Sequence, residues 1–571
     1  MSAPTDGRDN SMERRSFLAA TSAGVVGALA GCSGNSNSTD GNGDNSGNDL
    51  EVPVSDESEL GERLPGYTYH NVAEGQSPSE HDAHVLIADQ IQRLGLDVDM
   101  QTFEWGTLFT EVTQQYDFNF SGWLRTLGMY SGTRLPEMFH SKNLDPGAGN
   151  FTGYENPDLD PLLDEQLSTS DPDRRTELLH EIQAEIADYA GLNPVMYVPN
   201  SVVYDQEQVE GWVDAHREYE FALNMTSISV TNEENELRGA WSESIDTLNI
   251  LGWNNELKIE FHLDQIYDRL VRFDENLQPD EDFSLATDWT LSPEDNAIEY
   301  VIREGHTWHD GEPLTAEDVA FSLNYVKENE IPLYNPQTSI LDSAEALDET
   351  TVRVQFMEGE MPGPIHKQFS WRMPIVPMHI WEGIENPGER SVEAPVGSGP
   401  MEVEYWDQGS ELALQRNGDH FNPVSFDRRI TRIVPEASTQ IELLRSGDLN
   451  YLSRAAPQQL DSLLEEDQIA LEEGSSSAFW LHGMNSREDG LNEKAVRQAI
   501  TIAVPNTAIV EQIFNGYRTV PEANNIVSPS FGENYNPDTW SPDEGFEPAV
   551  SRLQEDGFGW DSDGNLHYPS E

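Results

Sequence analysis

Histidine and carboxylate side chains lie close together at two places where metal chemistry is conceivable. His306, His309 and Asp310 form the series His-x-x-His-Asp, and Asp561 opens the series Asp-Ser-Asp-Gly. A zinc protease needs His-Glu-x-x-His, and a calcium loop needs a distal bidentate glutamate; both are missing here. The sequence also lacks a Gly-x-Ser-x-Gly turn, a phosphate-binding loop and a defensible pair of catalytic acids. We therefore predict ordinary turns at both places, no metal, no cofactor and no enzymatic activity.

The first 50 residues indicate export and anchoring rather than a folded domain. Arg14 and Arg15 precede an uncharged apolar stretch, a pattern typical of a twin-arginine export signal. This stretch ends in Leu-Ala-Gly-Cys, which resembles a lipobox with Cys32, the only cysteine, as the lipidated residue. Residues 33–50 are rich in Ser, Gly, Asn and Asp and predict a flexible tether. No other stretch is long and apolar enough to span a bilayer. We predict an extracytoplasmic protein anchored through Cys32 to the outer face of the cell membrane.

Acidic residues dominate the whole length of the chain. It carries 104 Asp and Glu against 32 Lys and Arg, a formal net charge of −72. Self-repulsion of this size destabilises a compact chain in dilute buffer, whereas molar salt shortens the screening distance to about 3 Å. The 37% hydrophobic content, with 13 Trp and 21 Phe, is that of a globular protein. We predict a halophilic protein whose folding needs salt and which does not bind nucleic acid, because its carboxylates repel phosphates.

Helices and strands alternate along the chain. Residues 79–94 place their apolar side chains on one face of a predicted helix that a glycine ends, and residues 96–101 alternate as a half-buried strand. A second helix is predicted to begin at Pro172, since proline favours the first helical position. A third is predicted after Thr315, with Asp318 completing a capping box. This mixture indicates an α/β fold.

From residue 237 onward the sequence resembles the N-terminal half of the family 5 solute-binding proteins of ABC importers, the dipeptide, oligopeptide and nickel type. The most specific phrase is REGHTWHDG at 303–311, and PVGSGP at 395–400 is similar to the Gly-Ser-Gly-Pro turn of that family. LALQRNGDHF, STQIELLRSGDLNYL and HGMNSREDGLNEKAVRQAITIAV follow in the family's order. The resemblance implies that the Trp-His-Asp-Gly phrase is a hairpin turn of a peripheral subdomain.

The C-terminal half of the same family is also present, but it comes first. AHVLIADQIQRLGLDVDMQTFEW, FSGWLRTLG and DPDRRTELLHEIQAEIADYAGLNPVMYVPNSVVY resemble its second lobe and closing segments. The final phrase, AVSRLQEDGFGWDSDGNLHYPSE, resembles a mid-family unit that runs on into a strand, and such a strand lies at 67–72. We therefore expect a circular permutation, with the old termini fused near 231–237. Exposed loops tolerate such re-joining.

The resemblance implies a two-lobed α/β fold of the periplasmic-binding-protein type (type II, class C) with an extra subdomain, here circularly permuted. The expected boundaries are 1–32 for the signal, 33–50 for the tether, 51–194 for the second lobe, 195–269 for the main lobe, 270–394 for the peripheral subdomain, 395–455 for the main lobe again, and 456–571 for the rest of the second lobe.

The implied function is capture of a peptide-like solute by hinge closure and its delivery to an ABC permease and ATPase, by a monomer. Three alternatives stay open. The solute is an oligosaccharide or another small molecule, because aromatic side chains also stack on sugars; the protein is a sensor that feeds a receptor; or it is an extracellular hydrolase on the same scaffold.

The resemblance also nominates the ligand-binding residues. In the family the ligand lies between the lobes, near the Gly-Trp strand end, an early loop and a later aromatic strand. The matching positions, with neighbouring candidates, are Gly122, Trp123, Arg125, Tyr130, Trp253, Asn254, Trp371, Trp480 and Asn485.

One departure from the family concerns the charge of the ligand. Peptide-binding members usually follow the Gly-Trp pair with an aspartate that pairs with the ligand's α-ammonium group. Here the next acid after Trp123 is Glu137, whereas Arg125 and Arg134 lie between them. Arginine's planar fork suits a carboxylate, so the ligand group at this place is open between the two charges.

Overall fold

The computed structural model describes residues 52–127, 131–169, 171–214, 222–253, 259, 261–275, 278–357, 369–453, 455, 457–475 and 478–570. Cys32, Tyr130 and Asn254 lie outside this part of the chain, as do the predicted signal and tether. Residues 51–571 form one compact unit. Among the described residues no helix is both long enough and apolar enough to cross a membrane.

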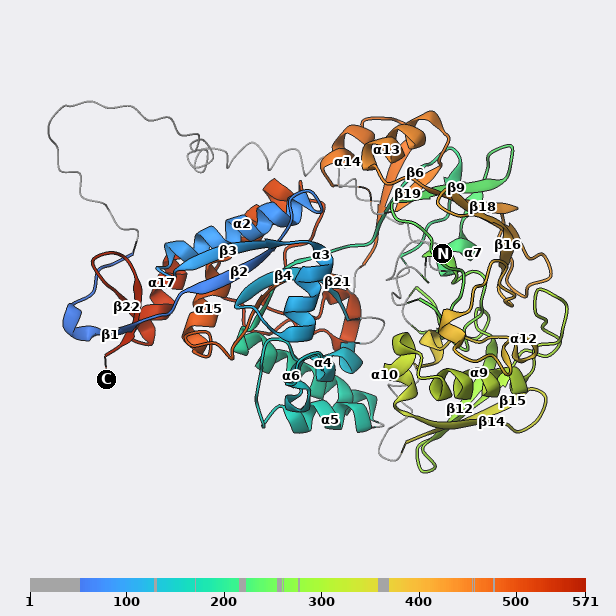
Figure 1. Ribbon diagram of the computed structural model, residues 1–571, viewed down its shortest axis with the longest axis horizontal. Helices are drawn as coiled ribbons and strands as arrows, with labels where there is room; N and C mark the ends of the chain where they lie inside the picture. Colours follow the sequence, from blue (N-terminus) through green and yellow to red (C-terminus); the bar gives the residue numbers. More distant parts are fainter. Residues whose placement is uncertain are drawn as a thin grey trace, which may run out of the picture. The chain divides into compact units, whose positions relative to one another are not determined.

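Five strands drawn from two distant parts of the chain form one sheet (Figure 1). β2, β3 and β4 run parallel, and β21 inserts antiparallel between β4 and β5. In sheet order the strands are β3 (Val98–Phe103), β2 (Tyr67–Val72), β4 (Phe120–Thr126), β21 (Ala478–Met484) and β5 (Leu192–Tyr197). Residues 51–194 and 456–571 therefore share a sheet, which is the arrangement that the predicted permutation needs; the permutation itself stays a prediction.

Helices bury apolar side chains from both halves of this region. The predicted helices are confirmed as α2 (Pro78–Arg93), which ends before Gly95 with its positive φ of 88°, and α6 (Pro172–Tyr189), whose first amides are capped by Asp171. Leu179 and Ile182 of α6 pack in one cluster with Trp123 of β4. The other helices of this region are α3 (Trp105–Phe109), α4 (Ser131–Phe139), α5 (Asp160–Ser168), α15 (Lys494–Ala503), α16 (Asn506–Ala508) and α17 (Phe546–Glu555).

A small sheet joins the beginning and the end of the described chain. Its order is β1 (Leu60–Arg63), β23 (Leu566–Pro569) and β22 (Gly559–Trp560). The backbone N–H of Ser570 donates to the carbonyl of Glu59 at 3.0 Å, and the Trp560 indole donates to the carbonyl of Leu94 at 2.7 Å. The strand pairing and these two bonds place residues near 60 beside residues near 570.

A three-stranded sheet lies where the chain passes between the five-stranded sheet and the rest of the protein. β6 (Ser201–Asp205) pairs with both β19 (Tyr451–Ser453) and β20 (Ile469–Glu473). Beside it lie α13 (Ala437–Ser446) and α14 (Pro457–Leu463), whose apolar residues share a cluster with Val203. The domain boundaries expected at 195 and 456 stay proposals, since β5 extends to Tyr197 and the strand pairing places the change of sheet at 198–200 and 474–477.

The rest of the described chain contains two four-stranded sheets. The first has the order β16 (Met401–Asp407), β17 (Glu411–Arg416), β18 (Arg428–Ile433) and β9 (Glu236–Trp241), with β9 parallel to β18. The second has the order β12 (Ala286–Ser292), β13 (Ala297–Ile302), β15 (Thr351–Phe356) and β14 (Leu341–Ala346). Helix α9 (Ala316–Glu328) packs against β14 and β15 and begins with the predicted capping box of Thr315 and Asp318.

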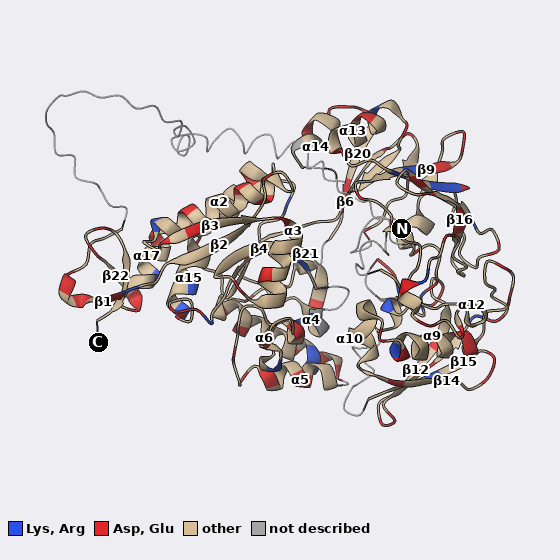
Figure 2. Cartoon of the chain, in the orientation of Figure 1, with Lys and Arg blue, Asp and Glu red and all other residues tan. Residues whose placement is uncertain are grey.

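The smaller elements complete these sheets. They are β7 (Val209–Glu210), α7 (Ala222–Ser227), β8 (Ser229–Val230), β10 (Arg272–Phe273), β11 (Pro279–Asp280), α10 (Asn335–Thr338) and α12 (Met378–Trp381). The old termini are expected to be fused near 231–237; residues 231–235 form the turn between β8 and β9, and residues 236–237 begin β9. Acidic side chains occur in helices and loops all along the described chain, as Figure 2 shows, whereas the five-stranded sheet carries few.

Candidate functional site

Gly122 and Trp123 lie on opposite faces of β4, and both serve packing. A Cβ atom at Gly122 would come within 2.7 Å of the carbonyl oxygen of Leu481, so the close approach of β21 requires glycine here. Trp123 is buried and contacts Phe151, with ring centroids 4.8 Å apart. These two nominated residues therefore build the sheet rather than an open binding surface.

Trp480 and Asn485 are buried as well. Trp480 lies against Gly122 and packs edge-to-face on His84 of α2, with ring centroids 5.1 Å apart. Asn485 donates through its side-chain amide to the carbonyls of Tyr116 and Phe118, at 3.2 and 2.9 Å. Asn485 thus fixes the loop that enters β4, and its contribution to a ligand site is indirect.

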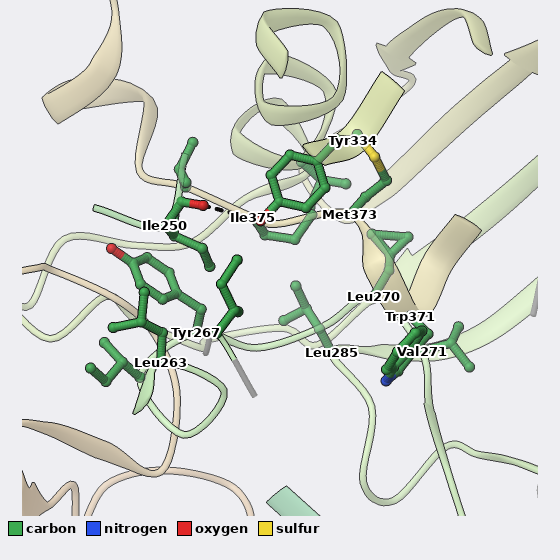
Figure 3. Packing of buried hydrophobic residues seen from close by; sticks show 14 of the residues in the cluster. Ile250, Leu263, Tyr267, Leu270, Val271, Leu285, Tyr334, Trp371, Met373 and Ile375 are labelled. Atoms are coloured by element: carbon green, nitrogen blue, oxygen red, sulfur yellow. Dashed lines mark hydrogen bonds between the residues drawn. The ribbon is translucent and has the colours of Figure 1, made fainter. Parts of the chain in front are cut away.

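Trp253 and Trp371 belong to a different hydrophobic cluster, which links the two four-stranded sheets. Both are at least 94% buried, at 6% and 4% exposure, and Figure 3 shows Trp371 beside Val271 within this packing. The phenol of Tyr334 donates to the carbonyl of Ile250 at 3.1 Å in the same cluster. The structure therefore does not bring these two tryptophans together with Trp123 and Trp480.

Arg125, a nominated residue on β4 of the five-stranded sheet, has a side chain that is 21% exposed. It follows Trp123 by two positions on β4, so its side chain leaves the sheet on the same face and lies over the ring of Phe151 at 5.7 Å. Its guanidinium lies 3.5 Å from the carboxylate of Glu137 on α4, to which Arg134 donates at 2.5 Å. We call Arg125, Arg134, Glu137 and Arg372, which also acts on Glu137, the arginine cluster.

The electrostatics of the arginine cluster favour a permanently charged Glu137. Burial alone would raise the pKa of Glu137, but Arg134, Arg125 and Arg372 outweigh it and lower the pKa below its ordinary value. Burial and Arg134 lower the pKa of Arg125, while Glu137 opposes them. The cluster therefore combines three cations with one anion.

A second group of charged side chains surrounds Asp268 and includes His306 of the histidine series. Asp268 accepts from His306 Nε2 at 2.9 Å, from His420 Nε2 at 3.1 Å and from the Ser398 hydroxyl at 3.0 Å. All four side chains are buried. We call them the aspartate hub. Burial would raise the pKa of Asp268, yet the two imidazoles hold that pKa far below its usual range.

The aspartate hub has the residue types of a metal site, with Asp268, His306 and His420 close enough to share one ion. The hydrogen bonds argue against that role. The backbone N–H of Asn422 donates to His420 Nδ1 at 3.0 Å, so Nδ1 is an acceptor and the proton of the neutral ring lies on Nε2. A protonated Nε2 that donates to Asp268 has no lone pair for a metal. The hydrogen bonds of the hub therefore indicate a structural role, in which Asp268 joins distant segments of the chain.

The two predicted turns have the contacts of turns. Trp308 N donates to Glu312 O at 2.9 Å around Gly311, and His309 bonds to the backbone of Gly397 and Gly399. At the other place, Asp561 accepts from the backbone N–H groups of Asp563 and Asn565, both at 2.9 Å. Among the described residues, His306 is the member of these two series that belongs to a group of possible metal ligands, the aspartate hub.

Two pockets elsewhere have about 450 and 440 Å³. The first is lined by residues that include Arg303, His306 and Phe421, and the second by residues that include Tyr189 and Arg497. No nominated ligand-binding residue lines either pocket. The sequence did not predict these pockets, because their walls come from segments that are far apart in the chain.

Comparison with known proteins identifies the family. Residues 283–570 match the model of the bacterial extracellular solute-binding proteins, family 5. The chain belongs to this family, which confirms the predicted family and its α/β periplasmic-binding fold class. The curated relatives described below are named as binding proteins.

Curated relatives match over part of their length. The oligopeptide-binding protein AppA of Bacillus subtilis is 25% identical over 264 residues, 44% of this chain and 46% of its own. The glutathione-binding protein GsiB of Escherichia coli is 26% identical over 267 residues, 45% of this chain and 50% of its own. The chain thus spans about half the length of the curated relatives it matches.

Solved structures resemble the chain more loosely. NikZ of Campylobacter jejuni, in complex with Ni(L-His), is 21% identical with a TM-score of 0.46, covering 59% of this chain and 66% of its own. AppA of Bacillus subtilis, in complex with a nonapeptide, is 22% identical with a TM-score of 0.44, covering 58% and 66%.

Proposed function

We propose that this chain is an extracytoplasmic, lipid-anchored binding protein that captures a peptide-like solute by hinge closure and delivers it to an ABC permease and ATPase without catalysing a reaction. The observation that carries the proposal is the family match over residues 283–570. The names of the relatives, an oligopeptide-binding and a glutathione-binding protein, favour a peptide-like solute.

Ligand screening in molar KCl tests this function. Peptides, oligosaccharides and nickel complexes are added to the purified chain, and the melting temperature is measured, because a ligand that binds only the folded state raises it. We expect peptides to raise the melting temperature and to reduce the radius of gyration in X-ray scattering as the hinge closes. A shift with oligosaccharides alone would replace the peptide by a sugar.

Lipid attachment at Cys32 is the second part of the proposal. A lipidated cysteine holds the protein at the membrane, and the tether at 33–50 lets the folded body reach its permease. Cys32→Ala should release the protein into the medium, as cell fractionation measures. A variant that stays as membrane-bound as the wild type would remove the anchor from the account.

Adaptation to high salt follows from the charge of −72 spread over the folded elements. We propose that the chain folds cooperatively in molar KCl and loses structure at about 10 mM, where screening reaches about 30 Å. Circular dichroism across KCl concentrations measures this. Full cooperative structure at the lowest concentration would contradict it.

We also propose that the order of the two halves is circularly permuted relative to the family. Its support is the sheet shared by β4 and β21, the contact between Glu59 and Ser570, and alignments that cover less than half of this chain, as order-preserving alignments of a permuted chain would. Packing depends on which faces meet, and loop closure costs only about 0.6 kcal/mol per doubling of length.

A re-joined chain tests the permutation. Opening the turn at 231–235 and linking residue 570 to residue 52 through a short Gly-Ser linker should preserve the fold, with stability within about 1 kcal/mol of the original. Denaturation in molar KCl measures it. A re-joined chain that does not fold would count against the permutation.

A further inference from the structure

Arginine is concentrated where this acidic chain otherwise carries few cations. Three guanidinium groups act on the single carboxylate of Glu137: Arg134 at 2.5 Å, Arg125 at 3.5 Å, and Arg372 from a distant part of the sequence. The whole chain has 32 cations against 104 acids. Arg125 and Arg134 therefore bring two positive charges to one carboxylate in a chain that is strongly acidic as a whole.

These groups are reachable from solvent but partly desolvated. The side chains of Arg125, Arg134 and Glu137 are 21%, 19% and 35% exposed. Phe151 lies beneath Arg125 and packs on Trp123, which makes one wall apolar. Charge-assisted hydrogen bonds are stronger in such surroundings, and salt screens them less than it screens pairs on an open surface.

Glu137 is a poor partner for a ligand ammonium group. It already accepts from Arg134, and the three arginines together hold its pKa low. An ammonium group placed there would meet the guanidinium groups of Arg125 and Arg134, whereas a carboxylate would meet complementary forks of N–H donors.

We propose that the solute is recognised at the arginine cluster through a carboxylate, with Arg125 and Arg134 as its binding residues and Glu137 as the internal anion that the solute carboxylate displaces. This inference rests on the proposed function, because it names the chemical class of the solute that the protein captures. It reverses the ammonium recognition that the family resemblance alone implied.

Four forms of tetra-alanine in molar KCl test the sign of the recognised charge: the free peptide, its N-acetylated form, its C-terminal amide and the doubly blocked form. Titration calorimetry measures each dissociation constant. We expect amidation to weaken binding about tenfold or more, because it removes a charge-assisted hydrogen bond. Acetylation should change the dissociation constant by less than about twofold. Loss on acetylation with no loss on amidation would overturn the inference and leave the proposed function standing.

Matched variants locate the effect. Arg125→Gln should abolish the difference between the free and amidated peptides, whereas Glu137→Gln should preserve binding or tighten it, because the internal competitor is gone. Arg174→Gln, which removes an exposed arginine of α6 in the same region, is the control and should bind like the wild type. A Glu137→Gln variant that loses binding would show that Glu137 meets an ammonium group and would contradict the inference.

Citrate separates failure of this inference from failure of the proposed function. If no form of the peptide binds the wild type, the peptide part of the proposed function is wrong. Citrate binding is then compared between the wild type and Arg125→Gln at equal ionic strength, with Arg174→Gln as the control. Affinity about tenfold higher in the wild type upholds carboxylate recognition, and equal affinity overturns it.

Discussion

The aspartate hub and the arginine cluster each contain one carboxylate with nitrogen donors around it, but the two groups have different roles. In the hub, two imidazoles and a hydroxyl donate to one carboxylate, and every member is buried. In the cluster, three cations surround one carboxylate, and Glu137 is 35% exposed. The hub has its hydrogen bonds satisfied internally, while the charged side chains of Arg125, Arg134 and Glu137 are partly exposed to solvent.

The difference teaches how to separate structural from functional polar groups in this fold. Buried polar groups must find partners inside the protein, so a completed network such as the hub joins segments and costs stability when broken. A partly exposed group with unbalanced charge contributes little to folding, because water and salt compete for it. It is therefore the better candidate for recognition.

The largest expected effect comes from breaking the hub. Asp268→Asn replaces a carboxylate, whose two oxygens accept three hydrogen bonds, with an amide that has one acceptor oxygen and an NH2 group, so at least one donor of the hub loses its acceptor. We expect a loss of about 3–5 kcal/mol in the free energy of unfolding, measured by denaturation in molar KCl. Asp427→Asn, at an exposed pair with Arg416, is the control and should cost less than about 1 kcal/mol. Equal losses of stability in the two variants would show that the buried hub contributes no more to folding than an exposed ion pair.

A buried histidine pair gives the next largest effect and a pH window that lies above the range in which the carboxylate of Asp268 is protonated. His84 and His482 lie beside Tyr69 and are fully buried, and burial lowers the pKa of each to about 3. Below pH 6.5 the unfolded chain takes up protons that the folded chain refuses, so stability falls as the pH falls. The carboxylate of Asp268 has a depressed pKa, so its contribution persists until the pH drops below the ordinary carboxyl range.

His482→Phe tests this window. Phenylalanine keeps the ring stacked against Tyr69 and Phe120 but cannot be protonated. Between pH 7 and pH 5 the wild type should lose about 2 kcal/mol more than the variant, measured by denaturation at each pH in molar KCl. Parallel losses in the two proteins would show that His482 is not held neutral by burial.

Gly122 offers a smaller, steric test of the same distinction. Gly122→Ala places a Cβ atom 2.7 Å from the backbone oxygen of Leu481, which cannot move without disturbing β21. We expect a loss of about 1–3 kcal/mol, measured by thermal and chemical denaturation. Gly75→Ala, where a Cβ atom meets nothing within 4 Å, should be close to neutral. An unchanged stability of Gly122→Ala would return this residue to the ligand-contacting candidates.

The smallest effect on stability is expected at the cluster. Glu137→Gln removes a partly exposed carboxylate, and molar salt screens the repulsion among the arginines that remain. The free energy of unfolding should fall by about 1 kcal/mol or less in denaturation without ligand. A loss as large as that of Asp268→Asn would make the cluster a second structural junction.

The sequence predicted local elements well because their causes are local. Pro172 with Asp171, the capping box of Thr315 and Asp318, and the glycine after α2 each act within a few residues. The family resemblance located β4 and β21, which pair directly. It was less informative about which aromatic side chains stay accessible, because Trp123, Trp371 and Trp480 owe their burial to partners from remote segments.

The arginine cluster was predicted in part. Arg125 and Arg134 stood out as cations where the family has an aspartate, and the pairing of Arg134 with Glu137 follows from their i, i+3 spacing on α4. Arg372 had no such signal, since only the folded chain brings it to Glu137. His420 likewise reaches Asp268 across a long stretch of sequence, and no local spacing connects the two.

Stability and ligand affinity measured together on two variants test the central distinction most directly. For Asp268→Asn we predict a large loss of stability in molar KCl with unchanged affinity of the folded protein for tetra-alanine. For Arg125→Gln we predict nearly unchanged stability and an affinity about tenfold lower or worse. If Arg125→Gln instead loses stability while binding the peptide as tightly as the wild type, the arginine cluster is structural and the account of solute recognition is wrong.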